Sequence, residues 1–206
     1  CVADLSNFYL DIAKDRLYVS APNDKRRRSC QTVMALIIER LAAAIAPVLC
    51  HMAEDIWQNI PYPTGTESVF LSGWPTVPDE WRDDSIQAPM QELRELRAAV
   101  NKVLEECRSK RELGASLEAA VRLEARTPAL QDALHWLQSK GDQEVDGLRD
   151  WLLVSQLQIG GEPWAELLAS DDNELAVIEV ALSRGEKCER CWHYESDIGQ
   201  SSDHPS

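Results

Sequence analysis

The spacing of apolar residues changes near the middle of the chain, and this change most constrains the fold. Between Ile86 and Cys107, apolar residues recur at every third or fourth position, which predicts a long amphipathic helix beginning near Asp83. We expect Gly114 to end this helix. Residues 117–126 instead alternate between apolar and charged side chains, which is the pattern of a half-buried strand. The sequence therefore predicts a helical part joined to a small sheet.

Two further helical patterns precede the long helix, at residues 3–19 and 33–60. Pro47 lies within the second pattern and should bend or break it. Residues 61–82 have no clear period and are rich in proline, so we expect a connector there. Its two tryptophans should fix the connector to the helices, because a buried indole contributes a large contact area.

The remaining chain predicts one more helix and two more strands. Residues 128–138 return to a helical pattern, and residues 153–159 and 176–182 alternate as strands do. We therefore expect a mainly α fold, in which a helical bundle is followed by a small three-stranded α+β unit. The expected parts are a bundle with its Pro-rich connector at 1–82, the long helix with the α+β unit at 83–184, and a separate module at 185–206.

Composition places the chain among globular proteins. Its 206 residues are 44% hydrophobic and 27% charged, which is enough for one large domain or two small ones with a packed core. No apolar run of about 18 residues and no signal-peptide pattern occurs, so we expect no membrane attachment. The sequence begins with Cys1 rather than Met, and we expect it to be a piece of a longer polypeptide.

The cysteine content favours reduced thiols. Cys30, Cys50 and Cys107 are isolated and lie in apolar helical patterns, where free cysteine is usually buried. A chain of this size needs no disulfides for stability. We therefore expect a reducing, cytoplasmic location.

Near the C-terminus, Cys188 and Cys191 are two residues apart and are followed by Trp192 and His193. A structural zinc ion takes four tetrahedral ligands, of which such a pair supplies two. The same spacing occurs in redox-active disulfides and can also arise by coincidence. The polar residues after Cys191 do not resemble the apolar helix of a redox domain, so half of a zinc site is the favoured interpretation.

The rest of the sequence does not complete such a site. No second cysteine pair follows, His193 lies too close to the pair, and His204 lies in a polar tail. We expect a zinc module cut through its middle, with weak zinc binding or none by these residues alone.

A net charge of −14 opposes non-specific binding of nucleic acid but leaves a local contact open. The run from Lys25 through Arg26 and Arg27 to Arg28 begins the second helical pattern, where the helix dipole disfavours cations. Contact with phosphate would compensate for the unfavourable interaction between these cations and the helix dipole. The alternative is a solvated cluster balanced by nearby acids, namely Asp11, Asp15 and Asp24.

The sequence contains no motif for catalysis. A Gly-rich phosphate loop and a G-x-S-x-G motif are absent, and the four histidines do not have the spacing of a metal site or triad. The chain is therefore interpreted as a binding or support module.

Several segments together resemble a known family. Residues 7–18, 27–33 and 46–57 resemble the anticodon-binding helical domain of bacterial-type isoleucyl-tRNA synthetases. Residues 110–119 resemble the segment after that domain, and residues 187–192 resemble the start of the family's C-terminal zinc module. The resemblance covers essentially the whole chain in the right order, and it implies a C-terminal fragment with an anticodon-binding bundle and a truncated zinc module.

The resemblance implies a class I synthetase that charges tRNA(Ile) with isoleucine, using ATP and Mg in a catalytic domain. The family's His-x-Gly-His and Lys-Met-Ser-Lys-Ser signatures do not occur in these residues. Catalytic and editing domains would therefore lie elsewhere, and we expect the chain alone to be inactive. The expected partners are the anticodon region of tRNA(Ile) and the other synthetase domains. The alternative is a noncatalytic helical interaction module with a metal-stabilised tail.

The resemblance implies that Cys188 and Cys191 are zinc ligands. It does not assign the residues that contact the anticodon. Lys187, Arg190 and Trp192 are candidates, because a cation beside an aromatic ring can bind phosphate while the ring stacks on an unpaired base. Arg26, Arg27 and Arg28 complete the set of candidate tRNA-binding residues.

Overall fold

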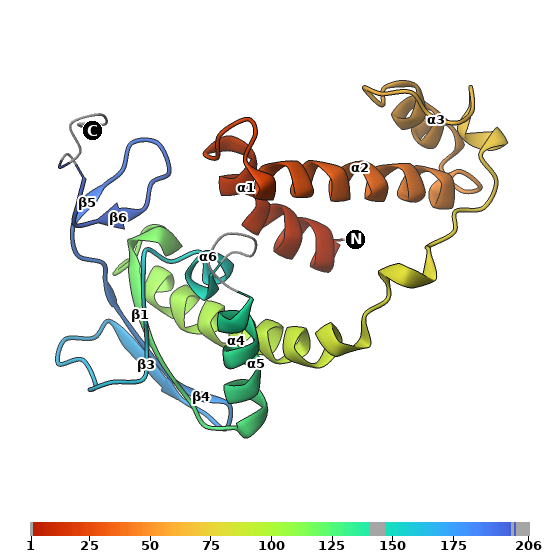
Figure 1. Ribbon diagram of the computed structural model, residues 1–206. Coiled ribbons are helices and arrows are strands. Elements are labelled where there is room, and N and C mark those ends of the chain that lie inside the picture. The colour runs from red at the N-terminus through yellow and green to blue at the C-terminus, as the bar shows by residue number, and fades with distance from the viewer. Residues whose placement is uncertain (1, 141–146, 199, 201–206) are drawn as a thin grey trace. The chain divides into compact units, whose positions relative to one another are not determined.

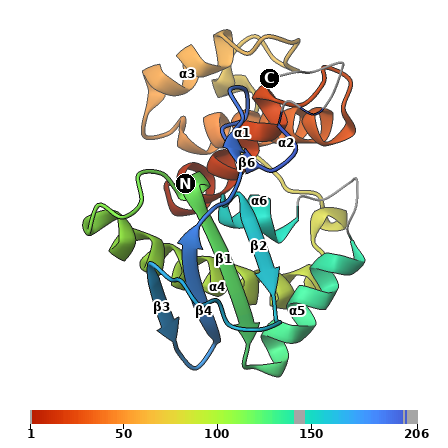
Figure 2. The ribbon, with the colours of Figure 1, turned by 90° about the vertical axis from the view of Figure 1, so that its left-hand side faces the viewer.

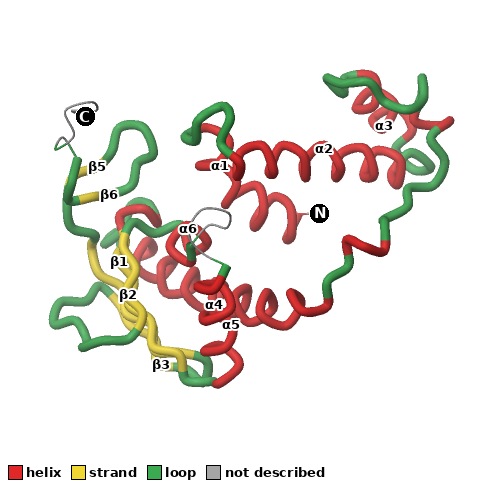
Figure 3. Tube along the Cα trace, in the orientation of Figure 1, coloured by secondary structure: helices red, strands yellow, loops and turns green. Residues whose placement is uncertain are grey.

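The computed structural model describes residues 2–140, 147–198 and 200, so Cys1 and His204 lie outside the described residues. The chain forms two compact units, one made of Ser20–Asp83 and the other of Cys1–Val19 with Asp84–Ser206. Helices predominate, and the strands are confined to the second of these units (Figure 3). The fold is therefore mainly α with a small strand-containing part, as the sequence predicts. Among the described residues, no helix has the length and apolar character needed to cross a membrane.

The smaller unit is built on two helices, α2 (Lys25–Ile45) and α3 (Cys50–Gln58) (Figure 1). The side chain of Asp24 caps α2 by accepting a hydrogen bond from the Arg27 N–H at 3.1 Å. The break expected at Pro47 is confirmed, because it lies between the two helices. The core is small and rich in alanine, comprising Ala42, Ala43, Ala46, Ala53, Trp57 and Val69.

The Pro-rich connector is held to these helices mainly by hydrogen bonds. Glu54 of α3 accepts bonds from the Ser68 hydroxyl at 2.9 Å and the Val69 N–H at 3.0 Å. Of the two tryptophans expected to fix the connector, Trp81 stacks against Arg40, with 4.6 Å between guanidinium carbon and ring centroid. The expectation is wrong for Trp74, whose side chain is 73% exposed.

The larger unit begins with a π-helical segment (Val2–Tyr9) that runs into α1 (Leu10–Tyr18). It continues with α4 (Asp84–Ser109), α5 (Pro128–Ser139) and α6 (Leu148–Leu152). Its strands are β1 (Ala119–Ala125), β2 (Gln156–Ile159), β3 (Ala169–Asp172) and β4 (Ala176–Leu182). A hairpin of β5 (Glu186–Lys187) and β6 (Tyr194–Glu195) follows.

The four longer strands form one sheet in the order β2-β1-β4-β3, in which β1 is parallel to β2 and antiparallel to β4. Figure 2 shows α4 crossing behind the strands. Alternate strand residues point to the core, so Val121 pairs with Leu157 on one side and Val180 on the other. They pack against fully buried residues of α4, and burying each such side chain contributes roughly 1.5–3 kcal/mol to the free energy of folding. These residues of α4 are Leu93, Leu96, Val100, Val103 and Leu104.

Two features of the larger unit differ from the sequence-based expectations. The sheet has a fourth strand, β3, whose sequence Ala-Ser-Asp-Asp has no apolar alternation because it is an edge strand paired with β4. Helix α4 ends before Gly114, because Arg111 adopts a left-handed φ of 63°. The Glu112 N–H then bonds to the Cys107 carbonyl at 3.0 Å, which closes the helix end.

Residues 2–19 pack with the chain from Asp84 onward, as part of the larger unit. Ile12 belongs to the core of the larger unit, and the Phe8 and Trp151 rings meet edge to face at 5.3 Å. The smaller unit begins after Val19 and ends at Asp83.

Candidate nucleic-acid interface and metal half-site

The turn between β5 and β6 carries both cysteines of the pair. The Cys188 N–H donates to the His193 carbonyl at 2.8 Å, and the Trp192 N–H donates to the Cys188 carbonyl at 3.0 Å. Trp192 adopts a left-handed φ of 67°, which tightens the turn. The hairpin thus places the two thiols close enough for each to influence the pKa of the other.

The environments of the two thiols differ. Backbone N–H groups of Cys191 and Arg190 point at the Cys188 sulfur and hold the pKa of that thiol below its usual value. Burial raises the pKa of the Cys191 thiol, although the backbone N–H of His193 opposes this effect. Metal binding requires thiolates, and N–H donors to sulfur stabilise a thiolate. The Cys188 environment therefore fits a zinc ligand.

The described residues supply only part of a zinc site. Two adjacent thiols are the soft ligands that zinc prefers, and Cys188 and Cys191 are the residues that would hold the ion. No group of three or more His, Cys, Asp or Glu side chains with metal-binding geometry occurs within the described part of the chain. The residues present therefore fit half of a tetrahedral site.

The base of the hairpin is anchored to the sheet-containing core. The Tyr194 N–H donates to the Ser155 hydroxyl at 2.8 Å, and Arg149 forms an ion pair with Glu195 at 2.7 Å. Gly185 has a φ of +107°, and a β-carbon there would collide with the Glu195 carbonyl oxygen. The close approach of the two strands thus requires glycine at position 185.

The tip of the hairpin is anchored to α1, at the other end of the sequence (Figure 2). The Arg190 guanidinium donates to the Val19 carbonyl at 2.6 Å, and His193 Nε2 lies 3.1 Å from Asp15 Oδ2. His193 is only 5% exposed, although it lies near the tip of the hairpin. The reason is that the turn directs the ring towards α1 while its neighbour Trp192 is 61% exposed.

Three of the six candidate tRNA-binding residues lie together on this hairpin. The Lys187 ammonium lies 5.5 Å from the centroid of the Trp192 ring, and both side chains are exposed. Arg190 is also exposed, but one of its amino groups is bonded to Val19. The hairpin therefore presents an aromatic face and a cation side by side.

The other three candidates occupy the first turn of α2, in the smaller unit. Arg26 and Arg27 are half-buried, and Arg28 is exposed. The Arg27 side chain donates to the Ser20 carbonyl at 3.4 Å, and the Asp24 cap adds a negative charge to this turn. Part of the run therefore has a structural role, and part of it faces solvent.

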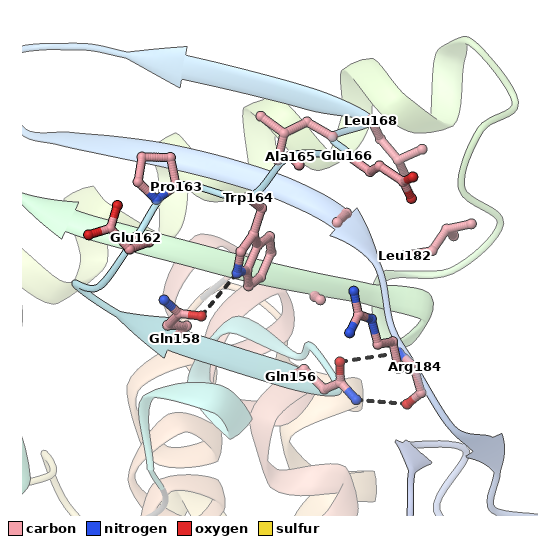
Figure 4. A pocket seen from close by; sticks show the side chains of 13 residues that line it. Gln156, Gln158, Glu162, Pro163, Trp164, Ala165, Glu166, Leu168, Leu182 and Arg184 are labelled. Atoms are coloured by element: carbon pink, nitrogen blue, oxygen red, sulfur yellow. Dashed lines mark hydrogen bonds between the residues drawn. The ribbon is translucent and has the colours of Figure 1, made fainter.

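A hollow of about 810 Å³ lies on the sheet face opposite α4, beneath the connection from β2 to β3 (Figure 4). Trp164 crosses it and donates from its indole N–H to Gln158 at 2.9 Å. Gln156 holds the backbone of Arg184, accepting from its N–H at 3.2 Å and donating to its carbonyl at 2.7 Å. Sequence analysis missed this hollow, because its lining comes from three separate segments.

Comparison with known proteins identifies two families that match parts of the chain. Residues 1–123 match the family described as the anticodon-binding domain of tRNA ligase, and residues 185–206 match a zinc finger found in FPG and IleRS. The chain is 95% identical over 205 residues to the isoleucine–tRNA ligase of Synechococcus sp. (strain CC9311). It is 74% identical over 206 residues to the isoleucine–tRNA ligase of Prochlorococcus marinus (strain MIT 9313).

Each of these alignments takes in 100% of this chain and 21% of the relative, so the chain spans about a fifth of their length. The zinc-finger match includes the Cys188/Cys191 hairpin. The match over residues 1–123 extends from the first helix through α4 into the sheet. The chain therefore belongs to the family of anticodon-binding domains of tRNA ligases.

Proposed function

We propose that this chain is the tRNA-recognition region of an isoleucine–tRNA ligase, which charges tRNA(Ile) with isoleucine using ATP. The observation that carries the proposal is the contact on the hairpin between the Lys187 ammonium and the exposed Trp192 ring, next to the metal half-site. The family match over residues 1–123 and the similarity to isoleucine–tRNA ligases support it.

Recognition depends on a local contact, because the net charge of −14 repels RNA at long range. The exposed Trp192 ring stacks on an unpaired base of the anticodon region, while Lys187 and Arg190 contact neighbouring phosphates. Arg26, Arg27 and Arg28 form a second, separate phosphate contact in the smaller unit. The remaining domains of the ligase are the chain's protein partners.

In the complete ligase, zinc is held by Cys188 and Cys191 together with two further ligands, and it stiffens the hairpin. ATP and Mg act in a catalytic domain, so these 206 residues alone give no isoleucine-dependent exchange of pyrophosphate into ATP. A cytoplasmic location is supported by the free thiols of Cys30, Cys50, Cys107, Cys188 and Cys191.

The hairpin contact is tested by Trp192→Ala in the complete ligase. Loss of a stacked base raises the KM for tRNA(Ile) by about 5- to 150-fold, while isoleucine activation keeps its rate. Trp74→Ala is the matched control, because Trp74 is at least as exposed but lies in the connector of the smaller unit. An unchanged KM in Trp192→Ala would show that the hairpin does not contact tRNA.

A further inference from the structure

Two contacts join the hairpin to the N-terminal helix, one from Arg190 to the Val19 carbonyl and one between His193 and Asp15 of α1. We propose that Asp15 is a positioning residue for tRNA recognition. Through His193, its carboxylate fixes the hairpin tip so that Trp192 and Lys187 face the RNA. This inference rests on the proposed function of the hairpin, and it assigns to α1 a role in orienting the recognition surface.

The position of Trp192 depends on its neighbour. Trp192 and His193 are consecutive, but 61% of the tryptophan is exposed and only 5% of the histidine. A left-handed φ is unfavourable for a residue with a β-carbon, so neighbouring contacts must hold Trp192 in it. Seating the His193 ring against Asp15 fixes the peptide that joins the two residues, and so directs the indole outward.

The tip and the base of the hairpin are held by different parts of the unit. Ser155 and Arg149 hold β6 at the base, next to the sheet. At the tip, the hydrogen bonds to α1 come from His193 and Arg190. Removing Asp15 would therefore release one of these two contacts of the tip, the one that positions His193, while the base stays attached. The Asp15 side chain is 41% exposed, so its loss leaves no cavity in the core.

The geometry indicates orientation rather than metal binding by His193. Its Nε2 faces a carboxylate, which can only accept, so Nε2 carries the shared proton. Its Nδ1 is buried and has no hydrogen-bond partner among the described residues. The described residues nevertheless contain no three-residue metal group that includes it.

The test is a double-mutant cycle in the complete ligase, with Asp15→Ala, Trp192→Ala and the double variant. Asp15→Ala is expected to raise the KM for tRNA by at least about fivefold, the lower limit for loss of one stacked base. The double variant should be no worse than Trp192→Ala alone, because Asp15 acts through the indole. Asp4→Ala is the matched control, since Asp4 forms an exposed ion pair with Arg94 away from the hairpin.

The conservative variant separates orientation from folding. His193→Gln keeps an N–H donor for Asp15 and should retain most of the tRNA affinity that His193→Ala loses. The melting temperature, the zinc content and the rate of isoleucine activation should be unchanged in Asp15→Ala.

Four outcomes of these experiments would overturn the positioning role of Asp15. Effects of Asp15→Ala and Trp192→Ala that multiply in the double variant would overturn the positioning role, as would an unchanged KM in Asp15→Ala. Loss of zinc from Asp15→Ala would also overturn it, because the contact would then maintain the fold of the hairpin. A normal KM for tRNA in Trp192→Ala would contradict the proposed function of the hairpin, and the positioning role of Asp15 would fail with it.

Discussion

Arg97 of α4 joins the N-terminal helix to the rest of the larger unit through Asp11, with 3.0 Å between guanidinium nitrogen and carboxylate oxygen. The Arg97 side chain is 7% exposed. It also donates to the Asn7 carbonyl at 3.2 Å and lies 5.3 Å from the centroid of the Phe8 ring. One buried cation therefore holds three residues of the N-terminal helical segment, Asn7, Phe8 and Asp11, against α4.

Replacing Arg97 by alanine should lower the free energy of unfolding by roughly 3 kcal/mol, as expected when one partner of a buried ion pair is removed. Urea denaturation followed by circular dichroism would measure this. Arg94→Ala is the control, because Arg94 pairs with Asp4 at the surface and its loss should change stability by less than about 1 kcal/mol. Equal effects of the two variants would show that the buried position of Arg97 has no special importance.

Glu54 should make the smaller unit sensitive to acid. Its pKa is lowered from 4.5, first by the hydrogen bond from Gln58 and then by those from Ser68 and Val69. A lowered folded-state pKa contributes stability above the unfolded-state value, and this contribution is lost as the pH falls through the folded-state value. Glu54→Gln should therefore be less stable than the parent at pH 7, with the difference shrinking below pH 4.5. A difference that is constant from pH 7 to pH 3 would contradict this account.

The basic run at the start of α2 is tested by changing Arg26, Arg27 and Arg28 to alanine together in the complete ligase. If these residues bind phosphate, the KM for tRNA rises. The slope of log affinity against log salt falls by about 0.7–0.9 for each phosphate that the variant no longer neutralises. Stability should change by less than about 1 kcal/mol, because removing cations from a helix N-terminus offsets removal of the hydrogen bond to Ser20. Arg126→Ala, which breaks a surface pair with Asp172, should leave tRNA binding unchanged.

An unaltered affinity and salt slope in the triple variant would assign the run to helix capping and solvation.

Zinc binding by the 206-residue chain should be weak, because Cys188 and Cys191 supply two of four ligands. Elemental analysis after dialysis should find well under one zinc per chain. A chain extended through a second cysteine pair should bind one zinc tightly, and Cys188→Ser should weaken that binding. One tightly held zinc per monomeric 206-residue chain would contradict the half-site interpretation.

The features predicted well from the sequence are those with local signals. The apolar stripe of α4, the break at Pro47 and the alternation in β1 all reflect spacings within a few residues. The spacing of Cys188 and Cys191 is a local signal of the same kind. Such patterns are visible because helices and strands place apolar residues at fixed intervals.

The features that were missed depend on contacts between distant residues. Asp15 and His193 are 178 positions apart, and nothing near either residue indicates their contact. Strand β3 owes its existence to pairing with β4, and Arg111 ends α4 although glycine is usual at such a position. Cys50 was expected to be buried, but it lies at the exposed start of α3.

The most direct test of the central claim measures binding of the complete ligase to tRNA(Ile) and to the same tRNA with a substituted anticodon. The account predicts that the substitution weakens binding by about tenfold or more, equivalent to about 1.4 kcal/mol of binding free energy. It also predicts that Trp192→Ala narrows this difference, because the Trp192 ring stacks on an anticodon-region base. Equal affinity for the two tRNAs, with normal isoleucine activation, would contradict the assignment of this chain to tRNA recognition.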